Sequence, residues 1–338
     1  MAFDKMIVKK LLKKFDDVPF VVKFPDGEEF KVGEGEPQAI IRANGGIDMG
    51  AVMKSPSLAL GEAYMDKTLE LEKGDLFEIL NMVLAKLEDF ASDFSGLTKI
   101  MKTSTSKKNQ KQEIATHYDI GNEFFELWLD ETMSYSCGYF KHETDTLYDA
   151  QVHKVEHILK KLNLKEGQTL LDIGCGWGYL LIAAAKKYHV KGVGITLSEE
   201  QYKKGQERIK AEGLEGQVEI RLMDYRDLEK SGMTFDRIVS VGMLEHVSRD
   251  NYPLFFKNID KVLNKKGIVL LHYISGRQEH DGDPWIKKYI FPGGIIPSLR
   301  EIIYLIGEYN YYTLDVESLR RHYEKTLLEW SKNYAAKR

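Results

Sequence analysis

The sequence predicts an α/β protein in which a doubly wound parallel sheet follows a smaller N-terminal α+β domain. From residue 113 onward, short apolar strands alternate with amphipathic helices, and this alternation builds parallel sheets with helices on both faces. The chain has 338 residues, a length that ordinarily divides into two domains. Apolar residues make up 43% and charged residues 30% of it, which is typical of a globular protein with a sizeable core.

Residues 1–95 are expected to form the α+β domain. Within residues 18–33, alternating apolar runs flank a Pro-Asp-Gly turn, a pattern that favours a β-hairpin. Helical patterns follow over residues 58–71 and 74–90. We find no catalytic constellation in this domain.

Residues 113–338 are expected to form the second domain, after a linker over residues 96–112. The later part of that linker, KTSTSKKNQKQ, has no large apolar residue, which is typical of an exposed connection. The expected strands are residues 169–173, 190–196, 217–223, 235–242 and 267–274, and the expected helices are residues 152–162, 179–188, 199–213 and 252–263. In such folds ligands bind outside the carboxyl ends of the strands, near the point where the strand order reverses.

The charge of the chain argues against a nucleic-acid partner, because the formal net charge is −4. Residues 1–15 differ locally, with five lysines and apolar neighbours at roughly helical spacing. Such a helix can rest on an anionic membrane surface. It can also be an ordinary surface helix with solvated lysines, and on this feature alone the second interpretation is favoured.

The sequence favours a cytoplasmic protein. Lysines interrupt the apolar runs at the N-terminus, and no cleavage site for a signal peptide follows. No apolar run approaches the length of a bilayer span. Only Cys137 and Cys175 are present, so a disulfide framework is not expected.

A glycine loop is the first motif that carries chemistry. Asp172, Gly174, Gly176 and Gly178 directly follow an expected strand and open a helix. Glycines let the backbone turn tightly and approach a ligand. The acid lies two residues before the first glycine, and the spacing is shorter than in the dinucleotide fingerprint. The loop therefore favours a Rossmann-like methyltransferase fold that binds S-adenosylmethionine over a dinucleotide-binding fold.

Two further strand ends supply candidate cofactor ligands. Asp224 and Tyr225 follow the third strand, where methyltransferases place an adenine-contacting acid. Thr196 ends the second strand, where most methyltransferases carry an acid for the ribose hydroxyls. Thr196 and Gln201 are candidates for cofactor hydroxyls or the methionine carboxylate. Helix capping is the alternative, and Ser198 is expected to cap the next helix with Gln201 as its partner.

A second constellation is spread along the chain. Glu245 follows the fourth strand and His272 ends the fifth, so both should lie at adjacent carboxyl ends near the cofactor. An acid and a histidine there could hold or move protons. Considered singly, each of these residues is as well explained by a structural role.

Together these segments resemble the cyclopropane and mycolic acid synthase family of S-adenosylmethionine methyltransferases, in particular the cyclopropane-fatty-acyl-phospholipid synthases. The resemblance covers nearly the whole chain. Its motifs are residues 114–119, 135–137, the glycine loop, 194–198, 245–247 and 289–294, and Tyr323 before Thr326, Leu327 and Trp330. The leading domain, with the motif ALGEAYMD, is similar to that of the phospholipid-acting members.

The resemblance implies a reaction at a cis double bond in an acyl chain of membrane phospholipid. The alkene attacks the methyl group of S-adenosylmethionine, which leaves a carbocation. Bound bicarbonate then removes a proton from the new methyl group, and the cyclopropane ring closes. The resemblance also implies a homodimer that associates peripherally with the inner face of the membrane.

The resemblance assigns the bicarbonate ligands and two more cofactor residues. Cys137 and Ile274 would offer backbone N–H groups to bicarbonate, and Glu245, His272 and Tyr323 would offer side chains. Tyr135 and Ser136 would contact the cofactor. A carboxylate beside an anion is tolerable if the bicarbonate O–H donates to it, since two like charges in a desolvated site repel strongly.

Aromatic rings can stabilise a carbocation. The motifs offer Tyr118, Tyr139, Phe140, Tyr273, Tyr289 and Phe291, and core packing explains each of them equally well. Members of the family continue beyond the Tyr323 segment in a helical tail with its own cysteine. No residue of this sequence up to Arg338 corresponds to that cysteine.

Three alternatives remain at this stage. One is a lipid C-methyltransferase that leaves a methyl branch. Another is a methyltransferase that acts on a small molecule such as an amine, which needs no base for a carbocation. The third is a non-catalytic protein that binds lipid or cofactor.

Overall fold

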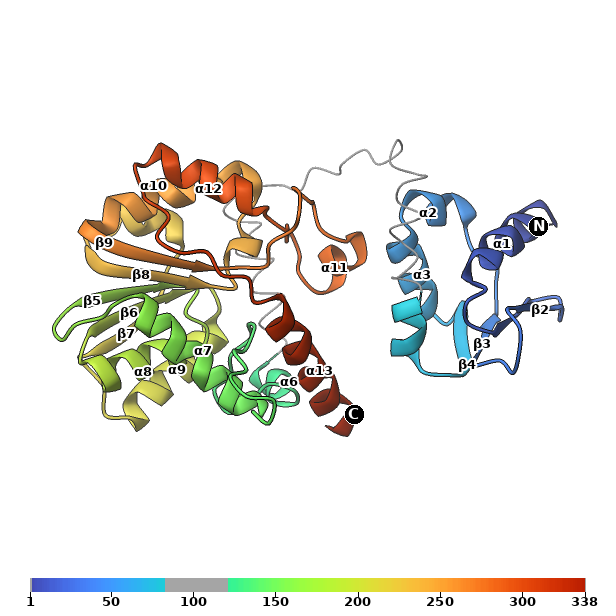
Figure 1. The fold of residues 1–338 in the computed structure, drawn as a ribbon, viewed down its shortest axis with the longest axis horizontal. Helices are drawn as coiled ribbons and strands as arrows, with labels where there is room; N and C mark the ends of the chain where they lie inside the picture. The colour runs from blue at the N-terminus through green and yellow to red at the C-terminus, as the bar shows by residue number, and fades with distance from the viewer. Residues whose placement is uncertain (1, 83–120, 338) are drawn as a thin grey trace. The chain divides into compact units, whose positions relative to one another are not determined.

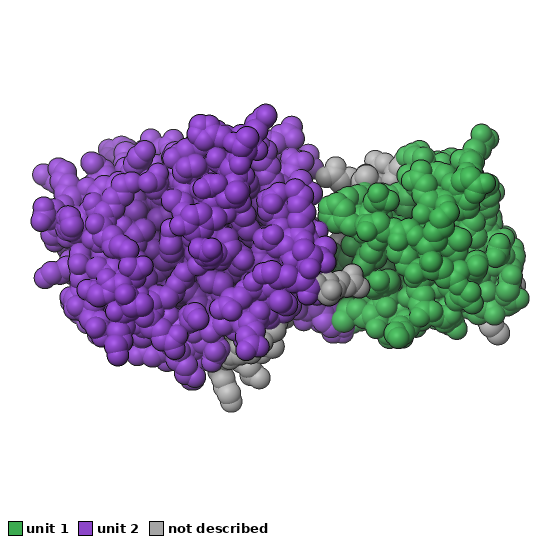
Figure 2. Space-filling view, turned by 90° about the horizontal axis from the view of Figure 1, so that it is seen from below, with its two compact units in different colours: residues 1–102, 283–286 green, residues 103–282, 287–338 purple. Residues whose placement is uncertain are grey.

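The computed structural model describes residues 2–82 and 121–337 of the chain. The chain divides into two compact units, coloured separately in Figure 2. Unit 1 comprises residues 1–102 and 283–286, and unit 2 comprises residues 103–282 and 287–338. The expected linker and the 114–119 motif, including Tyr118, lie outside the described residues.

Unit 1 contains a four-stranded sheet in the order β2-β1-β3-β4. Its strands are β1 (Phe20–Lys23), β2 (Glu29–Val32), β3 (Ala39–Ala43) and β4 (Leu69–Lys73). The expected hairpin is present, because β1 and β2 pair antiparallel. At its turn Gly27 adopts a φ of 84° and donates its N–H to the Phe24 carbonyl at 2.9 Å. The third strand is parallel to β1, and β4 is antiparallel to β3.

The helices of unit 1 are α1 (Ala2–Leu12), the short η1 (Lys13–Phe15), α2 (Met49–Lys54) and α3 (Pro56–Met65). The prediction of a helix over residues 58–71 is wrong for its last residues. The helix α3 ends at Met65, and Lys67 has a left-handed φ of 65°. The Asp66 carboxylate accepts the Thr68 N–H at 2.8 Å, and the chain then enters β4. A further helix is described over residues 76–82, and the rest of the range 74–90 lies outside the described residues.

The basic N-terminal helix is ion-paired within unit 1. The Lys5 ammonium lies 2.6 Å from Glu28 and 2.5 Å from Asp26, both in the hairpin. Lys9 also pairs with Glu28. The Lys5 ammonium lies 4.7 Å from the centroid of the Phe24 ring as well. Part of the positive charge of α1 is therefore neutralised by the hairpin on which the helix lies.

Unit 2 contains a five-stranded, all-parallel sheet in the order β7-β6-β5-β8-β9. Its strands are β5 (Thr169–Ile173), β6 (Lys191–Thr196), β7 (Val218–Leu222), β8 (Phe235–Val241) and β9 (Leu263–His272). From β5 the chain runs outward through β6 and β7 on one side and returns to β8 and β9 on the other. The predicted doubly wound α/β fold is thereby confirmed, with its switch point beside β5.

Helices cover both faces of this sheet (Figure 1). One face is covered by α7 (Leu147–Lys161), α8 (Tyr179–Tyr188) and α9 (Glu199–Ala211), and the other by α10 (Tyr252–Val262) and α12 (Leu299–Glu308). Helices α6 (Asn122–Glu126) and α13 (Arg320–Lys337) contribute to a separate cluster of buried residues, and α11 (Pro284–Tyr289) is divided between the two units. Short helical turns occur at η2 (Tyr225–Ser231), η3 (Leu244–His246) and η4 (Arg249–Asn251). Helix α7 begins earlier than expected because Thr146 and Asp149 form a capping box.

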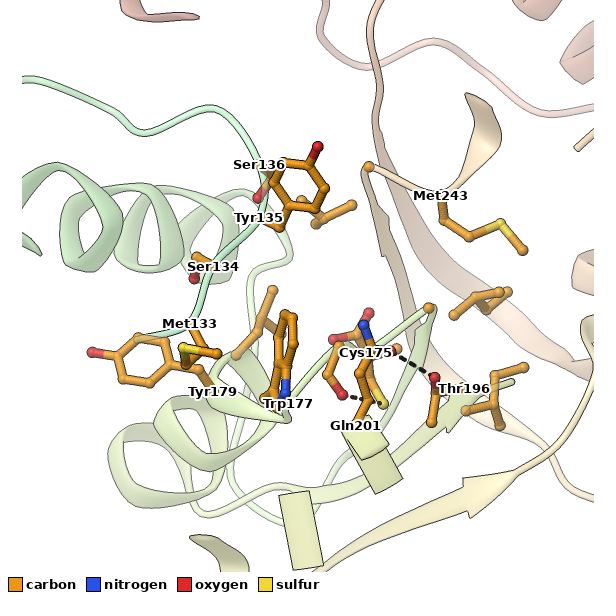
Figure 3. A pocket seen from close by; sticks show the side chains of 18 of the residues that line it. Met133, Ser134, Tyr135, Ser136, Cys175, Trp177, Tyr179, Thr196, Gln201 and Met243 are labelled. Carbon is orange, nitrogen blue, oxygen red and sulfur yellow. Dashed lines mark hydrogen bonds between the residues drawn. The ribbon is translucent and has the colours of Figure 1, made fainter. Parts of the chain in front are cut away.

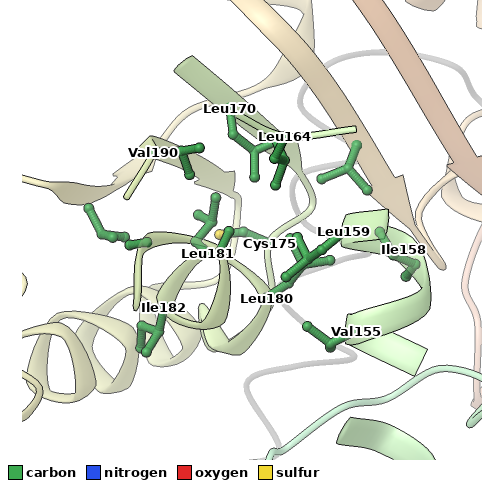
Figure 4. Packing of buried hydrophobic residues seen from close by; sticks show 14 of the residues in the cluster. Val155, Ile158, Leu159, Leu164, Leu170, Cys175, Leu180, Leu181, Ile182 and Val190 are labelled. Atoms are coloured by element: carbon green, nitrogen blue, oxygen red, sulfur yellow. The ribbon is translucent and has the colours of Figure 1, made fainter. Parts of the chain in front are cut away.

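Two hydrophobic cores lie on opposite faces of the sheet. Leu170 of β5 packs with side chains of α7, α8 and α9, some of which appear in Figure 4. Its neighbours Leu171 and Ile173 pack with α10 and α12, as the two-residue period of a strand requires. The first core includes Cys175, whose Sγ would lie 2.6 Å from a β-carbon built on Gly194. The sheet is thus fixed from both sides, and its strand ends are held in register.

Among the described residues, no helix is both long enough and apolar enough to span a membrane.

Candidate active site

A cleft opens at the carboxyl ends of β5, β6, β7 and β8, beside the switch point of the sheet. Segment 132–136 and helix α7 complete its wall. Eight predicted cofactor residues line it: Tyr135, Ser136, Asp172, Gly174, Gly176, Thr196, Gln201 and Tyr225. Gly178 and Asp224 are not among the lining residues. Figure 3 shows Thr196 and Gln201 on one side of the cleft and Tyr135 and Ser136 on the other.

The glycine loop adopts backbone conformations that require glycine. Gly174 has a φ of 80°, and a β-carbon there would lie 2.8 Å from Cγ of Met243. Gly176 has a φ of 54°, and nothing lies within 4 Å of a β-carbon built on it. Gly178 is the N-cap of α8. The loop therefore packs closely on one side and leaves open space above Gly176, where a ligand can approach the backbone.

Asp172 is buried at the end of β5, with 3% of its surface exposed. Its Oδ1 has no hydrogen-bond partner among the described residues. Burial raises the pKa of this carboxyl to about 7, although the charge of Lys154 acts to lower it. A buried carboxylate oxygen without a partner is a site for a hydrogen-bond donor that the described residues do not supply.

Thr196, Ser198 and Gln201 form a closed hydrogen-bond network after β6. The Thr196 hydroxyl donates to Oε1 of Gln201 at 2.8 Å and accepts the Ser198 N–H at 3.2 Å. The Ser198 hydroxyl accepts the Gln201 N–H at 3.2 Å and caps α9. All three residues are buried. Ser198 therefore caps as expected, and Thr196 and Gln201 are held rigidly in the wall of the cleft.

The region after β7 differs from the expectation for Asp224. Both oxygens of its carboxylate accept hydrogen bonds from the Arg226 guanidinium, at 2.9 and 2.6 Å. Its carboxylate is thus engaged by Arg226, and Asp224 is not among the residues that line the cleft. The flanking residues Met223 and Tyr225 line the cleft instead.

Glu245 lies in η3, directly after β8. Its Oε1 accepts the Ile274 N–H at 2.6 Å, and its Oε2 is buried without a partner among the described residues. Burial raises the pKa of this carboxyl to about 7. One of the two backbone donors expected for an anion is therefore already in contact with the carboxylate.

His272 is the last residue of β9 and pairs with Val241 of β8. Its Nδ1 is buried without a partner among the described residues. Burial lowers the pKa of the imidazole to about 4, and the charge of Lys154 adds to this effect. The ring is therefore neutral at neutral pH.

Tyr323 and Cys137 approach the same region from α13 and from the segment before α7. Burial raises the pKa of the Tyr323 phenol above its ordinary range, with further contributions from Tyr135, Glu245 and Cys137. Burial likewise raises the pKa of the Cys137 thiol to about 11, which makes it a poor nucleophile. The five predicted catalytic residues lie near the cleft but are not among the residues that line it.

The aromatic candidates separate into two groups. The Phe291 ring stacks on Tyr135 with centroids 5.9 Å apart. The Tyr139 ring is stacked between His157 and His322, with centroids 4.4 and 4.7 Å away. Both faces of Tyr139 are therefore covered, whereas Phe291 belongs to the aromatic wall around Tyr135.

The sequence reasoning missed Lys154, which lines the cleft from α7. Only 4% of its surface is exposed, and its ammonium donates to the Ser136 hydroxyl at 2.8 Å. A signal was available in the sequence, because Lys154 lies on the apolar stripe of α7 that also carries Val155 and Ile158. Trp177 and His246 also line the cleft and were not assigned. No cluster of metal-ligating side chains occurs among residues 2–82 and 121–337.

Comparisons with known proteins match both parts of the chain. Residues 105–338 match a family described as mycolic acid cyclopropane synthetase, and residues 7–95 match a domain of unknown function. The chain is 41% identical over 308 residues to the cyclopropane-fatty-acyl-phospholipid synthase of Escherichia coli K12, which covers 89% of this chain and 78% of the relative. It is 40% identical over 323 residues to a probable fatty acid methyltransferase of Pseudomonas putida, covering 94% and 81%.

A solved structure shares the fold of the second unit. Mycolic acid cyclopropane synthase CmaA1, complexed with SAH and CTAB, matches with a TM-score of 0.62 and 36% identity. The match covers 67% of this chain and 83% of that chain.

Proposed function

The chain belongs to the mycolic acid cyclopropane synthetase family of S-adenosylmethionine-dependent methyltransferases, and from this premise we propose that it converts a cis double bond in a membrane phospholipid acyl chain into a cyclopropane ring. Family membership confirms the resemblance found in the sequence. The observation that carries the finer proposal is a pair of buried, unpartnered polar atoms, Oε2 of Glu245 and Nδ1 of His272, at adjacent strand ends beside the cleft.

The described residues fit both small molecules that the proposal requires. The open space over Gly176 and the unpartnered Oδ1 of Asp172 suit the methyl donor, with Tyr135, Ser136, Thr196 and Gln201 as further contacts. The unpartnered atoms of Glu245 and His272 suit a small ion that can both donate and accept hydrogen bonds. When bound, S-adenosylmethionine supplies the methyl group, and bicarbonate supplies the base for the proton that this group loses.

The raised pKa of Glu245 resolves the difficulty of a carboxylate beside an anion. At a pKa of about 7, this carboxyl can keep its proton near neutral pH and donate it in a hydrogen bond. Its Oε1 would keep the Ile274 N–H, so Oε2 is the atom that faces the anion. The neutral His272 and the Tyr323 hydroxyl orient the same ion without adding charge.

The aromatic wall stabilises the positive charge that develops on the acyl chain. Phe291, Tyr135 and Trp330 lie ring to ring, with Tyr135–Trp330 centroids 5.3 Å apart. Ring faces attract a cation, and their apolar surface keeps water away from it.

Mass spectrometry of vesicle lipids tests the reaction. Unsaturated phospholipid vesicles are incubated with the protein and S-adenosylmethionine. We expect the acyl chains to gain one CH₂ and lose the double bond. Depletion of carbon dioxide from the buffer should slow the reaction, and added bicarbonate should restore it. If turnover is insensitive to bicarbonate, the anion site is wrong even if the product is a cyclopropane.

A second candidate function is a methyl branch on the acyl chain. It is favoured by the Pseudomonas putida relative, which is named a probable fatty acid methyltransferase. The same experiment separates the two if the lipids are also treated with ozone before mass spectrometry. Both products gain one CH₂ and have the same mass, but the branching enzyme retains a double bond that ozone cleaves, whereas the cyclopropane does not react.

We also propose that unit 1 docks the enzyme on the inner face of the membrane and supports a homodimer. The exposed Lys10 of α1 and Lys13 of η1 are available to anionic lipid, whereas Lys5 and Lys9 are paired internally. Charge reversal at Lys10 and Lys13 should reduce co-sedimentation with anionic vesicles. The same reversal at the exposed Lys160 and Lys210 of unit 2 is the control. Sedimentation velocity measures the dimer.

A further inference from the structure

Segment 137–140 is held on α13 by two hydrogen bonds to side chains. The Gly138 N–H donates to the Thr326 hydroxyl at 2.9 Å. The Phe140 N–H donates to Nδ1 of His322 at 3.0 Å. Most hydrogen bonds in proteins join backbone to backbone, whereas here two side chains of one helix accept from alternate residues of another segment. The position of the segment relative to α13 therefore depends on these two side chains.

Thr326 lies fully buried at this contact. Its hydroxyl accepts the Gly138 N–H and donates to the His322 carbonyl at 2.7 Å, one turn earlier in α13. A hydroxyl has a single donor, so its donor and one of its acceptor positions are both used. A side chain without the hydroxyl would leave the Gly138 N–H buried without this partner, which is costly.

Gly138 permits the close approach that this hydrogen bond needs. A β-carbon built on Gly138 would lie 3.0 Å from Cβ of Ala150 in α7 and 3.4 Å from the hydroxyl oxygen of Thr326. The next N–H, that of Tyr139, donates to the Ala150 carbonyl at 2.8 Å. The segment is therefore packed tightly between α7 and α13.

The His322 ring is held in position by stacking. It lies on one face of the Tyr139 ring, with centroids 4.7 Å apart, and the ring of His157 lies on the other face at 4.4 Å. Nε2 of His157 lies 2.7 Å from the carboxylate of Glu317, which precedes α13. Burial lowers the pKa of His322, so its Nδ1 is unprotonated near neutral pH and accepts the Phe140 N–H.

The two hydrogen bonds lie beside two residues of the proposed anion site. Cys137 immediately precedes Gly138. Tyr323 immediately follows His322. The Leu319 carbonyl also joins these residues, because it accepts the Tyr323 N–H at 2.9 Å and lies 3.8 Å from Sγ of Cys137. The Cys137 N–H and the Tyr323 hydroxyl therefore belong to two pieces of backbone that are held together.

We propose that Thr326 and His322 are positioning residues for the anion site. By holding segment 137–140 on α13, they set the distance between the Cys137 N–H and the Tyr323 hydroxyl, so that one small anion can contact both. This inference rests on the proposed function, since it concerns the bicarbonate of the same reaction. Neither positioning residue touches the anion, and each acts through the backbone that it holds.

Calorimetric titration of bicarbonate into the full chain tests the proposal. The protein is first dialysed into buffer free of carbon dioxide and saturated with S-adenosylhomocysteine. Thr326→Val keeps the shape of the side chain and removes the hydroxyl. We expect its Kd for bicarbonate to rise about tenfold, the effect of one lost hydrogen bond, and its Kd for S-adenosylhomocysteine to change by less than ~2-fold. Thr326→Ser restores the hydroxyl and should bind bicarbonate as the unsubstituted protein does.

Substitutions at His322 give a second measurement that does not depend on the folding of Thr326→Val. His322→Asn places an amide oxygen near the position of Nδ1 and should keep the affinity for bicarbonate within ~3-fold. His322→Phe keeps the stacking on Tyr139 but removes the acceptor, and should weaken bicarbonate about tenfold. Thr144→Val, at an exposed residue before α7, is the matched control and should change nothing. The KM for bicarbonate in lipid turnover should rank the variants in the same order.

Three outcomes overturn the inference. The first is unchanged affinity for bicarbonate in Thr326→Val and His322→Phe. The second is the same loss in Thr326→Ser as in Thr326→Val, because the hydroxyl would then not be the cause. The third is an equal loss of affinity for bicarbonate and for S-adenosylhomocysteine, which would make both residues part of the general packing. If the unsubstituted protein binds no bicarbonate, the proposed anion site itself fails, and this result is seen before any variant is compared.

Discussion

The two sides of the site are constructed differently. On the donor side, the residues from Asp172 to Gly178 and from Thr196 to Gln201 each run from the end of one strand to the start of the next helix. On the acceptor side, Glu245, His272 and Tyr323 come from η3, β9 and α13 and meet only through the fold. A substitution on the donor side should therefore act on cofactor affinity. A substitution on the acceptor side should act on turnover.

The largest expected effect is on the acceptor side. Glu245→Gln keeps an acceptor for the Ile274 N–H but replaces Oε2 with a group that cannot change its protonation. We expect turnover on unsaturated phospholipid to fall by ~10²-fold, the loss for a misplaced reacting group, because Glu245 positions the bicarbonate that acts as the base. Calorimetry should show S-adenosylhomocysteine bound as before. Glu215→Gln, at an exposed residue of unit 2, is the control, and full activity in Glu245→Gln would remove this residue from the mechanism.

The same substitution should stabilise the fold at high pH. The folded-state pKa of Glu245 is raised to about 7, so the native carboxyl binds its proton more tightly than the unfolded one. Its contribution to stability is therefore present at low pH and lost as pH rises from the unfolded value of ~4.3 through 7. The free energy of unfolding of Glu245→Gln should exceed that of the unsubstituted protein by up to ~4 kcal/mol at pH 8, at ~1.4 kcal/mol per pKa unit.

Urea unfolding at pH 8 and pH 4.5 measures this difference. The advantage of Glu245→Gln should shrink toward zero at the lower pH, because both side chains are then neutral. An advantage that is the same at both pH values would mean that packing, and not burial of charge, is responsible.

Gly174→Ala should affect both the donor side and the acceptor side, and so change both cofactor affinity and turnover. Its β-carbon would meet Cγ of Met243 at 2.8 Å and force a side chain into a left-handed φ of 80°. Met243 immediately precedes η3, which carries Glu245. We expect a loss of ~1–3 kcal/mol of stability, weaker binding of S-adenosylhomocysteine and lower turnover at saturation.

Gly213→Ala separates the effect of backbone strain from the effect of the contact with Met243. Gly213 has a φ of 66°, and nothing lies within 4 Å of a β-carbon built there. It should lose stability through backbone strain alone and keep its kinetic constants. If Gly174→Ala changes affinity without turnover, the donor and acceptor sides are independent even at this contact.

The smallest expected effect is confined to the donor side. Thr196→Val removes the hydroxyl that bridges Gln201 and Ser198. Loss of these bonds should cost ~1 kcal/mol, seen as a KM for S-adenosylmethionine raised about five-fold. The kcat at saturating donor should stay the same. A fall in kcat with unchanged KM would contradict the division between the two sides.

The donor residues are close together in the sequence and the acceptor residues are far apart, and this difference decides which of them the sequence could predict. The glycine loop and the strand ends follow from local periodicity, and β5 and α8 have the expected bounds. The acceptor residues are separated by many residues in the chain, so only resemblance to a family could group them. Local patterns also could not show that Asp224 pairs with Arg226, because the choice of partner depends on side-chain geometry.

Two misjudgements have physical causes. The helix expected over residues 58–71 continues an apolar rhythm that Lys67 ends with a left-handed turn, and strand pairing with β3 then decides the rest. Lys154 was missed because lysine is ordinarily a surface residue, although its place on the apolar stripe of α7 marked it. Both show tertiary contacts overriding local preference.

The contact between Cys175 and Gly194 has an evolutionary consequence. A β-carbon at position 194 would lie 2.6 Å from the Cys175 Sγ, 2.8 Å from its Cβ and 2.8 Å from Cδ1 of Leu181. An alanine at 194 therefore becomes tolerable only after both neighbours have become smaller. These three positions should covary among homologues, and the glycine of the second strand should be fixed in every lineage that keeps a cysteine in the donor loop.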